Sequence, residues 1–115
     1  MKQFLLIALF AVASLPITEA QIIKTSLTLT VRDELGNTVE GATVTLYETD
    51  ANYKEEKNPA ATGDTDKKGV VKFKDLKAIS YFVIVRKGDK GNMGGGEQIG
   101  KLEANKINKA TVIIQ

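Results

Sequence analysis

Carboxylates are the side chains of this sequence that could do chemistry, because the chain contains no histidine and no cysteine. Without imidazole or thiolate ligands the usual zinc and iron sites cannot be built, and Ser-His or Cys-His nucleophiles cannot form. Asp64 and Asp66 have the spacing that opens a calcium loop, but no glutamate follows at the required position. Aspartate readily accepts hydrogen bonds from nearby backbone N–H groups, so we predict that these acids cap a turn instead.

Two further acids flank a glycine run in the C-terminal third of the chain. Asp89 and Glu97 lie on either side of Gly94-Gly95-Gly96. The run lacks the lysine and the strand-to-helix context of a phosphate-binding loop, and two acids are too few to define a metal site. No pair of acids is placed to act together in a pocket. We therefore predict no catalytic, metal-binding or cofactor-binding residue, and we expect a protein that is not an enzyme.

The charge of the chain gives no reason to expect a nucleic-acid partner. The formal net charge is +2, and the sixteen lysines and arginines are scattered, with no run longer than two. One such pair, Lys67-Lys68, falls in a predicted turn, where a solvated surface position is its ordinary role. We predict that the protein binds neither nucleic acid nor an acidic membrane surface.

The first twenty residues have the layout of a cleavable secretory signal. Lys2 supplies a positive charge, residues 4–15 form an uncharged apolar run, and Pro16 ends that run. Thr18 and Ala20 are small residues at the −3 and −1 positions of a cleavage site. The apolar run is shorter than the roughly 20 residues that a membrane span needs. We therefore predict cleavage after Ala20 rather than an anchor that stays uncleaved.

Residues 21–115 are enough for one domain with a single hydrophobic core. The absence of cysteine excludes both a disulfide framework and a lipid anchor on an N-terminal cysteine, so the core alone must hold the fold. We predict one exported domain with no transmembrane span. It would lie in the periplasm, at the cell surface or outside the cell. A compact β domain without cysteine is typical of a bacterial envelope protein.

Alternating apolar residues predict a succession of short β-strands, with no helical period between them. In the first run, Leu27, Leu29 and Val31 alternate with polar residues. In the second run Tyr47 falls on the face that points away from the core. The predicted strands cover residues 24–32, 42–48, 70–74, 80–86 and 106–115.

Two polar connections interrupt these strands. Residues 49–63 lack alternation and predict a long loop with one short helical turn. Residues 87–100 include six glycines and predict a flexible loop. The strand over residues 80–86 carries apolar residues on both faces, which is typical of a central strand. Its second face, with Phe82 and Ile84, is expected to be covered, because large exposed patches are rare on monomers.

Short motifs follow one another in a fixed order along the predicted domain. A turn with Asp and Gly precedes a Gly-Ala step, a second Asp-Gly turn leads to a phenylalanine, and a leucine precedes a tyrosine-containing strand. The positions that carry them are Asp33, Gly36, Gly41, Ala42, Asp66, Gly69, Phe73, Leu76 and Tyr81. In this order they resemble the carboxypeptidase regulatory-like domain and its relatives, including the collagen-adhesin B-type repeats.

The resemblance covers nearly all of residues 21–115, and it implies an all-β fold. That fold is a transthyretin-like (prealbumin-like) sandwich, similar to an immunoglobulin domain, with about seven strands in two sheets. Such domains usually act as stalks, spacers or binding modules of secreted or envelope proteins. Hydroxyisourate hydrolases share the fold but use histidines, and the lack of histidine here excludes that activity.

The sequence departs from the collagen-adhesin pattern in one respect. Those repeats often carry an internal Lys–Asn isopeptide bond promoted by a glutamate in the tyrosine-containing strand. The corresponding strand, residues 81–86, has no acid, and Arg32 stands where the pattern needs a lysine. Lys24 and Asn108 could meet near a sheet edge, but no buried carboxylate is available to shuttle the proton. We predict that this bond does not form.

Two functions of different classes fit these observations. The first is a non-enzymatic interaction module that presents loops 49–63 and 87–100 from a rigid sandwich. Its partner would be an envelope protein, captured for example by strand addition at a sheet edge, with a glycan as the second option. The candidate contact residues are Tyr47, Tyr53, Asn92 and Met93, of which the two tyrosines would serve a glycan.

The second function is a structural or spacer subunit of an envelope complex that assembles with itself. Phe82, Ile84 and Ile113 would then form one self-complementary patch. The sequence leaves the oligomeric state open.

Overall fold

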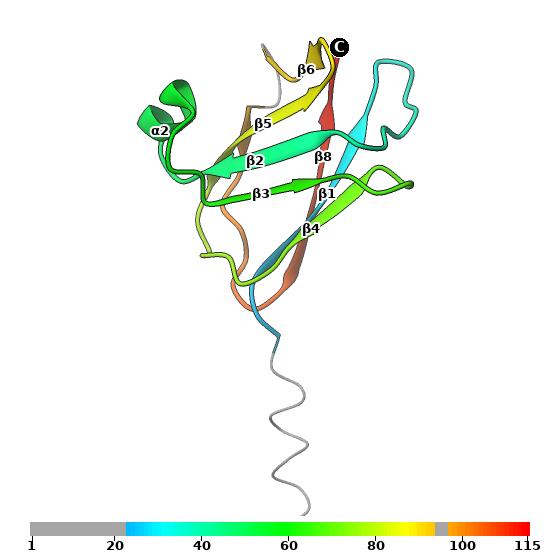
Figure 1. The fold of residues 1–115 in the computed structure, drawn as a ribbon. Coiled ribbons are helices and arrows are strands. Elements are labelled where there is room, and N and C mark those ends of the chain that lie inside the picture. Colours follow the sequence, from blue (N-terminus) through cyan, green and yellow to red (C-terminus); the bar gives the residue numbers. More distant parts are fainter. Residues whose placement is uncertain (1–22, 94–96) are drawn as a thin grey trace, which may run out of the picture.

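The computed structural model describes residues 23–93 and 97–115 and shows a β-sandwich with one short helix outside it (Figure 1). The predicted signal sequence and the triglycine run at 94–96 lie outside the described residues. The elements are β1 Ser26–Arg32, β2 Thr43–Tyr47, α2 Asp50–Glu55, β3 Ala61–Asp64, β4 Val70–Phe73, β5 Tyr81–Lys87, β6 Lys90–Gly91, β7 Gln98–Ile99 and β8 Ile107–Ile113.

The three-stranded sheet has the order β4-β1-β8, with β1 in the centre. β1 pairs antiparallel with β4 and parallel with β8. The parallel ladder is in register over the full length of both strands, from Ser26 opposite Ile107 to Arg32 opposite Ile113. The first and last strands of the domain therefore lie side by side, although about eighty residues separate them in the chain.

The five-stranded sheet has the order β3-β2-β5-β6, and the short β7 also pairs with β5. All of its pairings are antiparallel. Its longer strands cross those of the three-stranded sheet in Figure 1. This sheet holds β5 in its centre, which agrees with the prediction of a central strand that is apolar on both faces.

The hydrophobic core fills the space between the two sheets. Alternation sends every second residue of each long strand inward, so the inner faces supply the buried side chains. The fully enclosed ones are Leu27, Leu29, Val31, Val44, Leu46, Tyr81, Val83, Val85 and Ile114. Each such side chain contributes about 1.5–3 kcal/mol of burial free energy, which explains how a chain without disulfides holds this fold.

The structure confirms the predicted all-β sandwich of two sheets and all five predicted strands. It contains eight strands in the described residues instead of about seven. β3 was predicted as loop, because its sequence, ATGD, combines glycine and aspartate with little apolar character. The predicted helical turn within residues 49–63 is α2, whose first turn is capped by the Thr49 hydroxyl accepting from the N–H of Asn52 at 3.1 Å.

The motif aspartates form the predicted turns. Asp33 Oδ1 accepts hydrogen bonds from the N–H groups of Leu35 and Asn37, at 3.0 and 2.9 Å. Asp66 Oδ1 likewise accepts from Lys68 and Val70, at 2.8 and 3.1 Å. These N–H donors lower the pKa of both carboxyl groups, because they stabilise the charged form. Asp66 is thus a turn cap, as predicted.

Thr65 joins the Gly-Ala step to the second turn motif. Its buried hydroxyl donates to the carbonyl of Val39 at 2.6 Å and accepts from the N–H of Ala42 at 2.9 Å. Its backbone bonds Gly41 and Ala42 as well, at 3.0 and 2.9 Å. Two motifs that are separated by more than twenty residues in the sequence are therefore one hydrogen-bonded corner of the fold.

The remaining motif positions belong to the core. Phe73 and Tyr81 are buried, and Leu76 is half-buried against them. The Tyr81 hydroxyl lies at the end of the core, where it accepts a hydrogen bond from the N–H of Lys77 at 2.9 Å. A polar group at this depth requires a partner, and the turn after β4 supplies it.

Candidate functional site: the exposed surfaces of the sandwich

The helix α2 packs over part of the outer face of the five-stranded sheet, against β2 and β5. Tyr53 of the helix stacks on Phe82 of β5 with ring centroids 5.6 Å apart, and it meets Tyr47 of β2 edge to face at 6.2 Å. Tyr47 and Ile84 are buried beneath this lid. The expectation of an exposed Tyr47 is wrong, because strand alternation places it outside the sheet but the helix packs over it. Tyr47 is therefore not accessible to a glycan, whereas Tyr53 is partly exposed.

An ion pair fastens the end of α2 to the sheet. Arg86 of β5 donates to both carboxylate oxygens of Glu56, at 2.7 and 2.9 Å. This bidentate contact lowers the pKa of Glu56 and raises that of Arg86. Glu56 closes the helix in the left-handed region, with a φ of 55°. Glu56 thus makes a tertiary contact across thirty residues of sequence.

Asn92 has a structural role, which corrects its expected role as a contact residue in a flexible loop. Only 2% of Asn92 is exposed. Its side-chain oxygen accepts from the N–H of Val85 at 2.9 Å, and its amide donates to the carbonyl of Val83 at 3.0 Å. The side chain thereby mimics a neighbouring strand along β5. The adjacent Met93 is 61% exposed, so it alone keeps the expected role in this loop.

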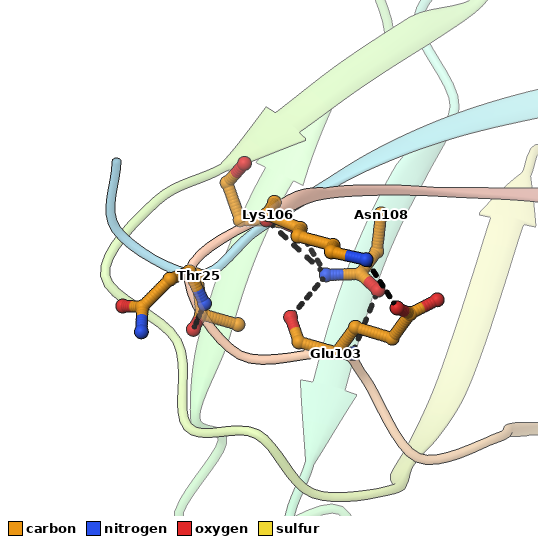
Figure 2. A network of polar contacts seen from close by, with 6 residues as sticks. Thr25, Glu103, Lys106 and Asn108 are labelled. Carbon is orange, nitrogen blue, oxygen red and sulfur yellow. Dashed lines mark hydrogen bonds and ion pairs between the residues drawn. The ribbon is translucent and has the colours of Figure 1, made fainter. Parts of the chain in front are cut away.

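A polar network closes the end of the sandwich where β8 begins (Figure 2). The Asn108 side chain accepts from the N–H of Glu103 at 2.8 Å and donates to the carbonyls of Ser26, Glu103 and Lys106. Lys106 Nζ donates to Glu103 Oε1 at 2.8 Å, which lowers the pKa of Glu103 and raises that of Lys106. The Thr25 hydroxyl accepts from the N–H of Asn105 at 2.8 Å.

This network fixes the loop before β8. It also binds the side chain of Asn108, the asparagine that an isopeptide bond with Lys24 would need. The amide of Asn108 is held by backbone groups. The ammonium of Lys24 lies 3.4 Å from a carboxylate oxygen of Asp75. The two residues are thus held in separate contacts, and that no isopeptide bond joins them stays a prediction.

The outer face of the three-stranded sheet carries lysines. Lys72 of β4 and Lys109 of β8 flank Thr28 of β1, and Lys74 follows on the same face two residues after Lys72. None of the three forms an ion pair within the described residues. These lysines do not form a run in the sequence. Neighbours on one face of a strand are two residues apart, and the third lysine comes from another strand.

Two of the five exposed large hydrophobic side chains among the described residues belong to β8. Ile107 and Ile113 are 60% and 48% exposed at its two ends. Ile23 shares a shallow groove of about 380 Å³ with Ile107, and Met93 shares one of about 300 Å³ with Ile113. Leu35, in the turn after β1, is the other exposed large hydrophobic among residues 23–93 and 97–115.

The expected patch of Phe82, Ile84 and Ile113 does not exist as one surface. Phe82 and Ile84 belong to the five-stranded sheet and lie under α2, whereas Ile113 lies on the outer face of the three-stranded sheet. Another groove, of about 580 Å³, follows β8 on the side away from β1, between that strand and residues 98–103. The free surface for contact is thus the edge of β8, not the face of β5.

The described residues contain no cluster of three acidic side chains that could hold a metal ion. Asp64, the first acid of the apparent calcium spacing, accepts a hydrogen bond from the Thr43 hydroxyl at 3.0 Å. Among the same residues, no helix has the length and apolar character to cross a membrane.

Neither a protein-family model nor a curated protein sequence matches this chain. Solved structures do match it. The pilus 2b backbone protein of group B streptococcus superposes with a TM-score of 0.58 and 15% identity, over 79% of this chain and 40% of that one. BcpA, the major pilin subunit of Bacillus cereus, gives 0.56 and 20% over 81% of this chain and 30% of its own.

The TIE protein of Bacillus anthracis also matches, with a TM-score of 0.56 and 26% identity over 80% of this chain and 17% of that chain. The chain spans less than half the length of these three structures. These likenesses show the fold, a β-sandwich similar to domains of two pilus subunits and of the TIE protein. This similarity agrees with the sandwich that the resemblance to collagen-adhesin B-type repeats implies.

Proposed function

We propose that this protein is an exported, non-enzymatic structural subunit or spacer that associates with itself in the cell envelope. The observation that carries the proposal is the likeness of its fold to pilus backbone subunits over about four fifths of the chain. The surface described above supports it, because β8 carries an exposed isoleucine at each end, with Ile23 beside one and Met93 beside the other. This function was the second of the two that the sequence suggested.

The finer assignments belong to the same proposal. Residues 1–20 are a secretory signal, and residues 21–115 are one domain of the carboxypeptidase regulatory-like and collagen-adhesin B-like type. The protein is released to the periplasm or displayed at the cell surface. Its partners are envelope proteins, foremost further copies of itself.

Analytical sedimentation tests this function. The sample is the exported protein, purified after the cell has processed it. A structural subunit will show a weight-average mass that rises with protein concentration, and in-cell cross-linking will give a ladder of multiples. A strict monomer at high concentration, without cross-linked multiples in the envelope, would contradict the proposal.

A second candidate is capture of a different envelope protein by the loop at residues 87–100. It is favoured by one observation, the exposure of Met93 beside the groove that Ile113 also lines. Deleting the loop is a poor test, since it would remove the structural contacts of Asn92 with β5. Substitution Met93→Asp leaves those contacts in place. Loss of a co-purified partner in Met93→Asp, with Leu35→Asp as control, would establish this second function.

A further inference from the structure

We propose that β8 is the assembly edge of the protein, and that it pairs antiparallel with β8 of a second copy about a two-fold axis at Ala110. The three-stranded sheets of the two copies would then form one continuous sheet. This inference rests on the proposed self-association and names its surface and register. Four observations lead to it.

The first observation is a row of backbone groups that have no partner. The bonds from Ser26 N–H to the Lys106 carbonyl, 3.0 Å, and from Ile114 N–H to the Arg32 carbonyl, 2.9 Å, fix which residues of β8 face β1. In a parallel ladder these are the even-numbered ones. The N–H and C=O groups of Ile107, Lys109, Thr111 and Ile113 therefore point outward, and no described residue bonds them.

The second observation is that this edge already accepts a partner at its end. Just after β8, Gln115 and Gly91 exchange two backbone hydrogen bonds, of 3.0 and 3.1 Å. The N–H and C=O groups of Gln115 thus point to the same side as those of the odd-numbered residues of β8. Gly91 provides hydrogen-bond partners for both groups of Gln115. The unpaired backbone groups begin at Ile113, next to that contact, and end at Ile107. Before Ile107 the chain turns at Asn105, which has a φ of 57°.

The third observation is the length and character of the edge. Natural sheets protect their edges by keeping edge strands short or by charging them. The other edge strands follow this rule, with four residues each in β3 and β4 and two in β6. β8 has seven residues, one lysine, and an exposed isoleucine at each end. A groove of about 580 Å³ separates this edge from residues 98–103 of the same chain.

The fourth observation is that the edge is complementary to itself when the two-fold axis lies at Ala110. With the axis at Ala110, Ile107 of each copy lies opposite Ile113 of the other, and Lys109 lies opposite Thr111. The outward-facing residues then form the reciprocally bonded pairs of an antiparallel ladder. Apolar pairs at both ends stabilise it. Moving the axis to Lys109 would place two lysines directly opposite each other, which destabilises pairing.

The lysine face excludes the other simple mode of self-association. Stacking two copies through the outer face of the three-stranded sheet would bring Lys72, Lys74 and Lys109 of each copy against the same residues of the other. None of these ammonium groups has a carboxylate partner within the described chain to offset the repulsion. Burial of unpaired charges is costly, so edge pairing is the favoured mode.

Cysteine cross-linking tests the surface and the register together, because the chain has no cysteine of its own. Two single variants, Ile107→Cys and Ile113→Cys, are treated with a short bismaleimide separately and as a mixture. In the proposed register the two thiols of the mixture lie about 5 Å apart between opposite residues. Like thiols within one variant lie about 20 Å apart, six residues along the strand, beyond the reach of the reagent.

The expected result is a covalent dimer in the mixture and none in either variant alone. Cross-linking in a single variant would overturn the register. Sedimentation of the wild-type protein separates the remaining outcomes. Association without any cross-link would overturn the β8 edge but leave the proposed function standing, and a strict monomer would overturn both. Both substituted isoleucines are exposed, so circular dichroism should show an unchanged fold.

A second variant tests the backbone bonds without thiols. Thr111→Pro removes an outward N–H group and leaves the ladder with β1 intact, because proline is tolerated at edge positions whose N–H faces away. Two donors are lost per dimer, and we expect the dimer dissociation constant to rise at least tenfold. Asp50→Pro, at the exposed first position of α2 on the other sheet, where proline is tolerated, serves as the control for a new proline. An unchanged dissociation constant in Thr111→Pro would contradict edge pairing.

Discussion

Gly69 shows why one position of the second turn motif must be glycine. Its φ is +77°, and a Cβ built there would lie 2.8 Å from the Thr38 Cβ, 3.0 Å from the Val39 nitrogen and 3.1 Å from the Val31 carbonyl oxygen. Two of these three neighbours are backbone atoms, which cannot move aside. The position therefore requires glycine both for its conformation and for its space.

We predict that Gly69→Ala lowers the free energy of unfolding by about 3 kcal/mol, from backbone strain and overpacking together. Gly36→Ala is the matched control. Gly36 also has a positive φ, of 89°, but a Cβ there would meet nothing within 4 Å. That variant should lose only about 1 kcal/mol. Urea denaturation of both variants checks the difference, and equal losses would show that the crowding around Gly69 relaxes.

Asp66 should make the stability of the protein depend on pH. The N–H groups of Val70 and Lys68 lower its pKa in the folded state from the ordinary value of 3.8. A lowered pKa contributes stability that is complete above the unfolded value and is lost as the pH falls through the folded value. We predict that Asp66→Asn is less stable than wild type at about pH 7, and that the difference shrinks at about pH 2.5.

Chemical denaturation at both pH values measures this effect. Asp89→Asn is the control. Asp89 is exposed in the turn between β5 and β6, and its side chain makes no hydrogen bond or ion pair with the described residues. A difference for Asp66→Asn that stays constant between the two pH values would mean that its charge does not stabilise the turn.

The contrast between Asp66 and Asn92 shows which residue roles a sequence reveals. Asp66 bonds N–H groups two and four residues ahead, so local spacing was enough to predict a cap. Asn92 bonds β5 across a turn, seven and nine residues away, from within a stretch that reads as flexible because of its glycines. Nothing local distinguishes such an asparagine from one in a mobile loop.

At the scale of elements, α2 acts as a lid over the five-stranded sheet. The helix has no buried residue of its own, and it is attached by Tyr53 and by the contact of Glu56 with Arg86. A helix of six residues is not stable by itself in water, so these tertiary contacts must hold it.

We predict that Tyr53→Ala lowers the free energy of unfolding by about 2 kcal/mol, since it removes a half-buried ring from two aromatic contacts. Lys54→Ala, on the neighbouring position of the same helix, should cost no more than about 0.5 kcal/mol, because its ion pair with Asp50 is exposed. Thermal and urea unfolding compare the two. A loss for Tyr53→Ala as small as that for Lys54→Ala would show that the lid contributes little.

The same lid explains the errors made from the sequence at this scale. Alternation correctly assigned Tyr47 to the outer face of β2, but it carries no information about which later segment packs on that face. β3 was missed for a related reason. Its residues have weak strand preference, and the strand exists because β2 offers it a partner and Thr65 anchors its end.

At the scale of the whole molecule, charge should regulate self-association. Each copy has a formal net charge of +2 and presents its lysines on the sheet that edge pairing would extend. Two such copies repel each other, and salt screens exposed charges beyond a Debye length of about 10 Å at 0.1 M. We predict that the dimer dissociation constant falls as sodium chloride rises from low to physiological concentration.

Sedimentation equilibrium across a salt series measures this dependence. Lys109→Gln removes the charge closest to the proposed axis and should flatten the salt dependence, whereas Lys54→Gln on α2 should leave it unchanged. Association that weakens with added salt would indicate attraction between opposite charges and a different interface.

The parallel pairing of β1 with β8 has a mechanical meaning. The chain enters β1 at one end of the ladder and leaves β8 at the other (Figure 1). Tension that arrives before Ser26 and departs after Ile113 runs along both strands, so it loads their hydrogen bonds in shear and all at once. A hairpin pulled at its open end would unzip bond by bond. A subunit strung in series by these two strands would thus bear a pull with its entire central ladder, through hydrogen bonds alone.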